Sequence, residues 1–345
     1  MNTGSKAFAS LLVTGGAGFI GSNFIRFVLT ERPGVRIINL DALSYSGNPE
    51  NLAEVEGDPR YQFVQGDVND GALVAELLAE VDAVVHCAAE THVDRSILEA
   101  RPFILANVLG TQTLLDALRA NPKRMVHVST DEVYGALPLE RPDVKFVEDT
   151  PLAPRSPYAA SKAASDLLVL AHHETYGSDV SITRCSNNFG PYQFPEKVIP
   201  LFVTNLLEGK PVPLYGDGQN VRDWLHVLDH CEAVLAVLEG GRAGEVYNVG
   251  GNNERSNLEL TRAILTIMGK GEEMIEMVKD RPGHDRRYAI DAGKIGRELG
   301  WAPSRSAWPG ALEDTVAWYV EHADWWRRVK SGAYREYYQQ QYVER

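Results

Sequence analysis

Two groups of side chains in this sequence could carry out acid–base chemistry. Tyr158 and Lys162 stand four residues apart in a segment with a helical pattern, so both side chains share one helix face, one turn apart. A nearby ammonium group favours the tyrosinate form and lowers the pKa of the phenol, which would make Tyr158 a base near neutral pH. This spacing alone is more typical of a solvated helix face, so its interpretation depends on the surrounding fold.

The second group, Thr130, Asp131 and Glu132, directly follows an apolar stretch that is typical of a buried strand. Thr130 could hydrogen-bond a substrate hydroxyl. Two adjacent carboxyl groups usually serve as turn or helix-cap residues. At the carboxyl end of a parallel strand, where ligands of open α/β sheets bind, they could instead divide the roles of general acid and general base.

The first two thirds of the chain alternate short apolar stretches with helical patterns. The apolar stretches are nearly continuous, as expected of parallel strands that helices cover on both faces. The predicted strands are Ser10–Thr14, Val35–Asp41, Tyr61–Asp67, Ala83–Ala88, Arg124–Ser129 and Val180–Arg184. The predicted helices include Phe19–Glu31, Pro102–Arg119 and Pro157–Tyr176, the last with Ser156 as N-cap and Gly177 after its end. The pattern predicts an α/β fold with a Rossmann-like, doubly wound parallel sheet.

The first predicted strand runs directly into a glycine-rich segment, Gly15–Gly21, and then a helix. Gly15 permits a tight turn, Gly18 lets the backbone approach a pyrophosphate, and Gly21 lets helix and sheet close together. The helix N-terminus offers amide donors to the phosphates. Asp41, at the end of the second strand, is placed to bind a ribose diol and would repel a 2′-phosphate. The segment therefore predicts a site for NAD rather than NADP.

Asp67, after the third strand, would meet the adenine end of the dinucleotide or would serve as a helix N-cap, and its neighbours leave both interpretations open. The first domain is predicted to span residues 1–186. Residues 187–345 would form mainly a smaller, interleaved substrate-binding domain, with about 223–250 returning to the first. The expected NAD-binding residues are Gly15, Gly18, Phe19, Ile20, Gly21, Asp41, Asp67, Val68, Ala88, Tyr158 and Lys162.

The composition restricts the function classes. The 345 residues include 34 Lys and Arg against 47 Asp and Glu, a net charge of −13 that disfavours general binding to nucleic acid or anionic membranes. No apolar run approaches the ~18 residues of a membrane span. Cys87, Cys185 and Cys231 are too sparse for a zinc knuckle or a disulfide framework, and His172-His173 lacks an accompanying set of ligands, so no metal is expected. We expect a cytoplasmic protein of a reducing compartment.

The same motifs resemble a known family. The Gly15–Gly21 loop with Tyr158 and Lys162 resembles the extended short-chain dehydrogenase/reductase family, and within it the chain is similar to the nucleotide-sugar 4,6-dehydratases. Thr130-Asp131-Glu132 is the most specific match. Phe189 in place of a tyrosine and His226 in place of an aromatic residue depart from the pattern without removing a catalytic group. Further stretches that carry the likeness are Ala89–Ser96, Ser129–Gly135, Ser156–Lys162, Asn187–Lys197, Tyr215–Trp224 and Asp280–Asp285.

The resemblance implies NAD as cofactor, dTDP-glucose as substrate and a 4-keto-6-deoxy sugar nucleotide as product. In the mechanism that the resemblance implies, Tyr158 takes the proton of the 4-hydroxyl and Glu132 removes the proton on carbon 5. Asp131 protonates the departing 6-hydroxyl. The resemblance also implies a homodimer through the helices Pro102–Arg119 and Pro157–Tyr176.

The substrate end of the site would need cationic and amide donors for a diphosphate, although each arginine taken singly is more typical of a surface ion pair. The expected substrate-binding residues are Ser96, Thr130, Asn187, Glu196, Lys197, Arg222, Asn257, Arg281 and His284. Two alternatives to a dehydratase are a nucleotide-sugar epimerase or decarboxylase on the same scaffold, and a non-catalytic NAD-binding sensor. The sensor would predict loss of Tyr158, Lys162 or the carboxylates, all of which are present.

Overall fold

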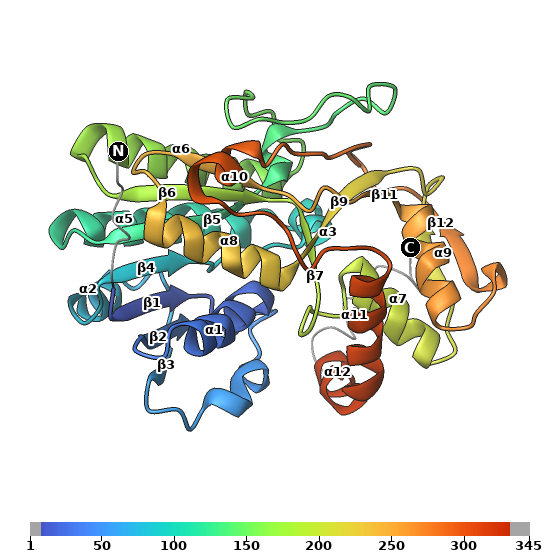
Figure 1. Cartoon of the computed structure of the whole chain (residues 1–345), viewed down its shortest axis with the longest axis horizontal. Helices are drawn as coiled ribbons and strands as arrows, with labels where there is room; N and C mark the ends of the chain where they lie inside the picture. The colour runs from blue at the N-terminus through green and yellow to red at the C-terminus, as the bar shows by residue number, and fades with distance from the viewer. Residues whose placement is uncertain (1–7, 332–345) are drawn as a thin grey trace.

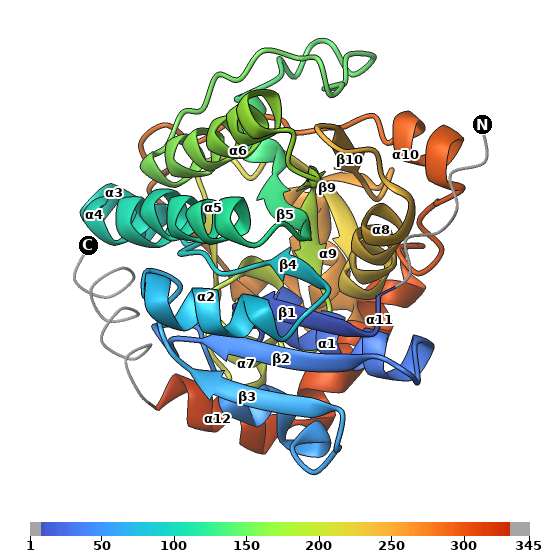
Figure 2. The ribbon, with the colours of Figure 1, turned by 90° about the vertical axis from the view of Figure 1, so that its left-hand side faces the viewer.

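The computed structural model describes residues 8–331. Its main layer is a seven-stranded parallel sheet in the order β10-β6-β5-β4-β1-β2-β3 (Figures 1 and 2). The strands of this sheet are β1 (Ser10–Thr14), β2 (Arg36–Asp41), β3 (Tyr61–Gln65), β4 (Ala83–His86), β5 (Arg124–Thr130), β6 (Val180–Cys185) and β10 (Val246–Val249).

Alternate residues of the central strands enter two separate cores. Leu11 and Val13 pack with α1 (Phe19–Glu31) and α8 (Val227–Gly240), whereas Leu12 packs with α2 (Gly71–Ala79), α5 (Gly110–Ala120) and α6 (Pro157–Tyr176). Figure 2 shows these helices on the two faces of the sheet. Burial on both faces explains the continuous apolar strands and confirms the predicted doubly wound fold.

A smaller part, at the right of Figure 1, carries a three-stranded sheet in the order β11-β9-β7 and a two-stranded sheet of β8 and β12. Phe202, Trp224, Leu312 and Trp326 lie in its core. Its elements are β7 (Asn187–Phe189), α7 (Val198–Leu207), β8 (Val212–Tyr215), β9 (Val221–His226), β11 (Glu254–Ser256), α9 (Asn257–Ile267), β12 (Ile275–Val278), α11 (Gly310–Glu321) and α12 (Ala323–Lys330). Helix α10 (Gly293–Leu299) contacts β10 and α8.

The helices α1 and α6 have the predicted bounds, and most strands end within two residues of prediction. The predicted helix Pro102–Arg119 is confirmed in its extent, because the chain is helical from Arg101 to Ala120, but it contains a π-helical segment that the sequence did not predict. The chain forms α4 (Arg101–Phe103), a π-helical segment η2 (Ile104–Leu109) and then α5. Within η2, the carbonyl oxygen of Asn107 accepts hydrogen bonds from Thr111 and Ser165, both at 2.6 Å, and these side-chain bonds accompany the widened turn.

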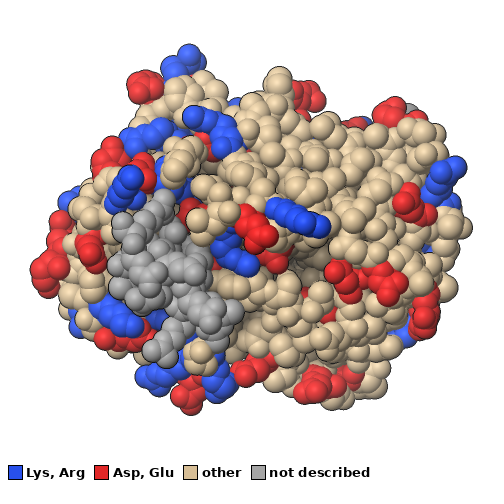
Figure 3. Space-filling view, turned by 180° about the vertical axis from the view of Figure 1, so that it is seen from behind, with Lys and Arg blue, Asp and Glu red and all other residues tan. Residues whose placement is uncertain are grey.

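The composition also raised expectations about membrane spans, metal sites and surface charge. None of the helices within residues 8–331 combines the length and apolarity that crossing a membrane requires. In the same range, no three His, Cys, Asp or Glu side chains gather in a metal-binding arrangement. Figure 3 shows acidic and basic side chains interspersed on the face opposite that of Figure 1.

Candidate active site

The glycine-rich loop after β1 is held by close backbone contacts. Gly15 has a φ of +70°, and a Cβ there would lie 2.6 Å from the amide nitrogen of Ala88. A Cβ on Gly21 would lie 2.3 Å from the carbonyl oxygen of Gly15. Gly18 is the N-cap of α1 and provides no side-chain bond to the first helical amides. These amides therefore remain available to a pyrophosphate, and the cradle fits a dinucleotide.

Asp41, the last residue of β2, joins this loop to the segment that follows the strand. Its Oδ2 accepts from the amide of Ala17 at 2.9 Å, and its Oδ1 accepts from that of Leu43 at 2.8 Å. Burial raises the pKa of Asp41, while the two backbone bonds lower it. Asp67 lies in the turn after β3 and accepts from Asn69, at both its amide and its side chain. The alternative of Asp67 as helix N-cap is wrong, because Asp70 caps α2.

Thr130, Asp131 and Glu132 lie where β5 turns into the short 3-10 helix η3 (Asp131–Tyr134). The Thr130 hydroxyl accepts from the Glu132 amide at 3.3 Å and donates to Asp131 Oδ1 at 3.4 Å. Burial, followed by the negative charges of Glu132 and Asp223, holds the pKa of Asp131 well above its usual value. A raised pKa favours the protonated form of Asp131, the form that a general acid needs.

Glu132 experiences a different electrostatic environment from its neighbour. Burial raises the pKa of Glu132, but the positive charges of Arg281, Arg222 and Lys197 act against that rise. Two adjacent carboxyl groups with unlike environments are the arrangement that separates an acid from a base.

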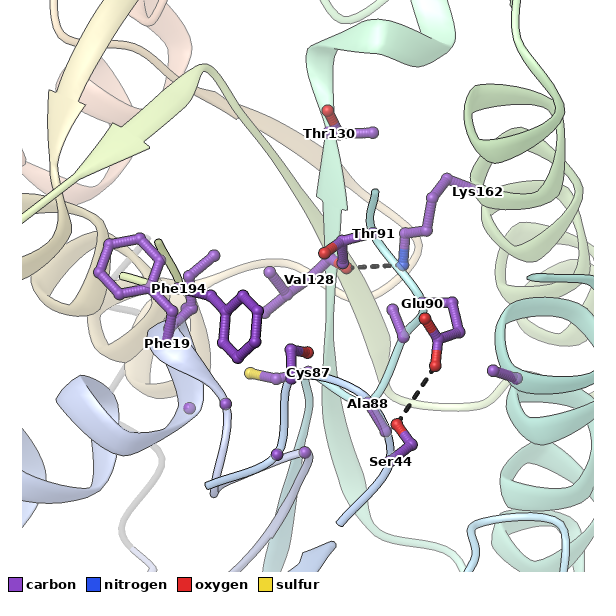
Figure 4. A pocket seen from close by; sticks show the side chains of 18 of the residues that line it. Phe19, Ser44, Cys87, Ala88, Glu90, Thr91, Val128, Thr130, Lys162 and Phe194 are labelled. Carbon is purple, nitrogen blue, oxygen red and sulfur yellow. Dashed lines mark hydrogen bonds between the residues drawn. The ribbon is translucent and has the colours of Figure 1, made fainter. Parts of the chain in front are cut away.

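Ser156 caps α6 by accepting from the amide of Ala159 at 3.1 Å, and this cap fixes Tyr158 and Lys162 on the first turns. The prediction that the ammonium group lowers the pKa of Tyr158 is wrong for this structure. Burial and then the Glu132 charge raise that pKa well above its usual value, although a hydrogen bond with Thr130 lowers it. The Lys162 Nζ donates to the carbonyl oxygen of Val128 at 2.9 Å (Figure 4).

These elements enclose one cavity of about 460 Å³, a size typical of a cofactor or substrate site. All of the expected NAD-binding residues line it, together with Thr130, Asp131 and Glu132. The expected substrate residues Asn187, Glu196 and Lys197 line it as well. Burial raises the pKa of Glu196 to about 7, and its Oε2 lies 3.8 Å from His92 Nε2. The structure thus brings the dinucleotide loop and the acid–base groups to one hollow.

Five expected substrate residues do not line this cavity: Ser96, Arg222, Asn257, Arg281 and His284. The buried Ser96 hydroxyl accepts from the Tyr158 amide at 3.2 Å and donates to the Val93 carbonyl at 2.6 Å, so it positions the start of α6. Asn257 lies in the first turn of α9, where its amide donates to the carbonyl of Asn220 at 2.9 Å.

Arg222, Arg281 and His284 make contacts of their own outside the cavity, and burial lowers the pKa of His284 to about 3. Arg222 donates to the Asp285 carbonyl at 2.9 Å, and His284 Nδ1 lies 2.6 Å from Asp280 Oδ1. Arg281 Nη1 lies 3.4 Å from Oδ1 of Asp94, a residue of α3 (Val93–Leu98).

Sequence reasoning missed several lining residues, among them Ser44, Glu90, Thr91 and Phe194. Figure 4 shows Ser44 bonded to Glu90, a contact of 3.2 Å that links the segment after β2 to the segment after β4. Glu90 and Thr91 follow β4 at the sheet edge where β5 ends. The rule that ligands bind beyond carboxyl strand ends could have found them.

Comparison with known proteins agrees with this geometry. The family model described as GDP-mannose 4,6 dehydratase matches residues 12–310. The dTDP-glucose 4,6-dehydratase of an Actinoplanes strain is 54% identical over 92% of this chain and 99% of its own. That of Xanthomonas campestris is 53% identical over 95% of this chain and 97% of its own. A solved dTDP-glucose 4,6-dehydratase from Streptomyces venezuelae, with NAD and TYD bound, has a TM-score of 0.90 and 54% identity, covering 93% of this chain and 100% of its own.

The parallel sheet, the glycine cradle and the Tyr158–Lys162 pair at its cavity define a short-chain dehydrogenase/reductase of the extended, NAD-dependent type. More narrowly, the match over most of the chain is to sugar-nucleotide dehydratases. The chain belongs to the dTDP-glucose 4,6-dehydratase family.

Proposed function

We propose that this protein converts dTDP-glucose to dTDP-4-keto-6-deoxyglucose and water, with the hydride of carbon 4 delivered to carbon 6. The observation that carries the proposal is the pair Asp131 and Glu132, adjacent in one cavity with Tyr158 but in unlike electrostatic environments. A simple dehydrogenase or epimerase has no need of a second acid and base beside the tyrosine.

When bound, NAD⁺ supplies a hydride acceptor for carbon 4, a donor for carbon 6 after reduction, and a positive charge that favours the tyrosinate form of Tyr158. Tyr158 takes the proton of the sugar 4-hydroxyl. The 4-ketone acidifies carbon 5, and Glu132 removes the proton there. Asp131, whose raised pKa favours its protonated form, gives its proton to the 6-hydroxyl, which departs as water. When the hydride reaches carbon 6, a proton returns to carbon 5, and the product forms with no net change of redox state.

The substrate residues follow from the same assignment. Asn187, Glu196 and Lys197 line the cavity and would contact the hexose or the adjoining phosphate. Arg222, Arg281 and His284 would bind the diphosphate, supported by the reach of both arginine charges to Glu132. Asn257 would contact the nucleotide.

The test is incubation of the purified protein with dTDP-glucose and, in parallel, GDP-mannose, followed by mass spectrometry. We expect dTDP-glucose to lose the mass of one water and to give the absorbance of a 4-keto sugar in alkali. A UDP-glucuronic acid 4-epimerase from Bacillus cereus shares the fold at 28% identity, with a TM-score of 0.82. A product of unchanged mass would indicate such an epimerase, and the absence of any product would indicate a non-catalytic NAD-binding protein.

We also propose that the protein is a homodimer. Apolar side chains are exposed along α3 to α6, among them Leu98 at 67%, Leu167 at 58% and Tyr176 at 51%. A second copy that packed its α5 and α6 against this face would bury them. Sedimentation velocity should give the mass of two chains, and a Leu167→Arg variant should shift toward one. A single-chain mass for the unaltered protein would contradict the proposal.

The protein is also proposed to work in the cytoplasm. Cys87, Cys185 and Cys231 are free thiols, which supports a reducing compartment. Fractionation of the source cells should place it with cytoplasmic markers, and recovery with secreted proteins would contradict this.

A further inference from the structure

A chain of buried polar side chains runs from Lys162 away from the cavity into the protein. The Lys162 Nζ lies 3.3 Å from His127 Nε2, and that nitrogen lies 3.5 Å from Asp166 Oδ1. The other carboxylate oxygen of Asp166 accepts from Arg184 Nε at 2.8 Å. Arg184 in turn donates to the Tyr134 hydroxyl at 3.0 Å. The chain thus alternates a cation, a neutral ring, an anion and a second cation.

Neighbouring elements bring these groups together. Lys162 and Asp166 stand one turn apart on α6, while His127 and Arg184 come from the adjacent strands β5 and β6. The side chains of His127 and Asp166 are 0% exposed, and that of Arg184 is 3% exposed. Buried charges persist only where partners offset their loss of hydration, so each of these charges depends on the others.

Asp166 is the source of negative charge near Lys162, because the other groups around Lys162 are neutral or positively charged. Besides Tyr158, the titratable or charged groups near Lys162 or His127 are His86, Cys87, His127, Asp166, Arg184 and Cys185. Burial raises the pKa of Cys87 to about 12 and lowers that of His86 to about 3. It also raises the pKa of Cys185 and holds that of His127 well below its usual value. The two thiols and two imidazoles are therefore neutral at pH 7.

Burial lowers the pKa of Lys162, and the charge of Asp166 raises it. His127 Nε2 lies within 3.5 Å of both side chains, and all three residues are buried, so the attraction between Asp166 and Lys162 acts in a medium of low dielectric constant. We propose that Asp166 is a positioning residue that, across His127, keeps the Lys162 ammonium group charged and fixed at the end of β5. This inference rests on the proposed function, in which Tyr158 is the base. Lys162 stands one turn from Tyr158 on α6, and Asp166 acts on Lys162 from outside the cavity.

Two variants of the same ion pair test the proposal. Asp166→Asn and Arg184→Gln each break the Asp166–Arg184 contact and each leave a buried charge without that partner. We therefore expect the two variants to lose similar amounts of free energy of unfolding. Their electrostatic effects on Lys162 are opposite, because one removes an anion and the other a cation. The pH at which Lys162 loses its proton can be followed by NMR of protein labelled with ¹³C at the lysine Cε, with the signal assigned by its loss in Lys162→Arg.

In Asp166→Asn we expect this midpoint to fall by roughly one pH unit or more, and in Arg184→Gln to stay or rise. The alkaline limb of kcat/KM should move with it. If Asp166→Asn does not fold, the double variant Asp166→Asn/Arg184→Gln, which leaves neither charge buried, should still lower the midpoint. An unchanged midpoint in the folded Asp166 variants, or equal shifts in both single variants, would overturn the proposal.

The NMR titration needs no substrate. A lowered midpoint in a protein that fails to dehydrate dTDP-glucose would therefore overturn the proposed function while supporting the role of Asp166.

Discussion

Substitution of the glycines in the β1–α1 loop should separate cofactor binding from folding. In Gly18→Ala, the new methyl group meets the Gly15 carbonyl oxygen at 3.3 Å and otherwise faces open space at the cavity. The backbone there has a φ of −78° and a ψ of 179°, which alanine adopts without strain. In Gly21→Ala, the methyl group would lie 2.3 Å from the Gly15 oxygen and 2.7 Å from the Gly16 Cα, and these backbone atoms cannot rotate away.

The expected magnitudes follow from these distances. Forcing a methyl group into a packed site destabilises by about 1–3 kcal/mol, so Gly21→Ala should lose at least that much free energy of unfolding and bind NAD⁺ weakly as well. Gly18→Ala should keep nearly the unaltered stability. Its methyl group stands where the pyrophosphate approaches, and the same 1–3 kcal/mol expressed as binding corresponds to roughly a five- to 150-fold rise in the Kd for NAD⁺.

Urea denaturation and calorimetric titration of cofactor-free protein with NAD⁺ would measure the two effects. Gly57 is exposed, and a methyl group added there would meet nothing within 4 Å, so Gly57→Ala is a control that should change neither quantity. Undiminished NAD⁺ affinity in Gly18→Ala would refute the placement of the pyrophosphate. Stability of Gly21→Ala equal to that of the Gly57 control would refute the packing argument.

Four further predictions concern the acid–base groups and Asp41. Asp131→Asn should slow dehydration by about 10²–10⁴, whereas Glu132→Gln should still oxidise carbon 4 but fail to exchange the carbon 5 proton with deuterated solvent. Because the raised pKa lets folded Asp131 keep a proton that the unfolded chain releases above about pH 4, the unaltered protein loses stability as the pH rises through that region. Asp131→Asn should therefore have a larger free energy of unfolding than the unaltered protein at about pH 7, but not at about pH 3. Urea denaturation at the two pH values would measure this difference. Tyr158→Phe should slow single-turnover formation of NADH, followed by absorbance, by about 10²–10⁴, and a normal rate would assign the base to another group. Asp41→Ala should narrow the preference for NAD⁺ over NADP⁺ by roughly ten- to 150-fold, and an unchanged ratio of the two Kd values would place Asp41 away from the ribose.

Local signals account for the parts of the fold that the sequence predicted well. The helix Pro157–Tyr176 has its observed bounds because Ser156, Pro157 and Gly177 each satisfy a backbone requirement at its ends. The π-helical turn η2 depends instead on bonds from Asn107 to Glu90 and Ser161, which are distant in the sequence. No local pattern encodes such a contact.

The residues of the candidate site also divide into those that sequence signals could place and those that depend on distant contacts. Residues at strand ends, such as Asp41 and Thr130, could be placed because parallel strands deliver their carboxyl ends to one edge. The place of Ser96 could not be predicted in this way, because its hydroxyl accepts a hydrogen bond from the Tyr158 amide in a contact between two helices. The direction of the Tyr158 pKa also depends on burial and on the Glu132 charge, which the spacing of Tyr158 and Lys162 does not contain.

The central claim is that one active site oxidises carbon 4, removes water across carbons 5 and 6, and returns the same hydride to carbon 6. The most direct measurement uses dTDP-glucose carrying deuterium at carbon 4, incubated with the protein in the presence of unlabelled NADH, with the product analysed by mass spectrometry and NMR. We expect a product lighter by one water, with the deuterium at carbon 6 and undiluted. Deuterium that stays at carbon 4, or is lost to the added NADH, would contradict the claim.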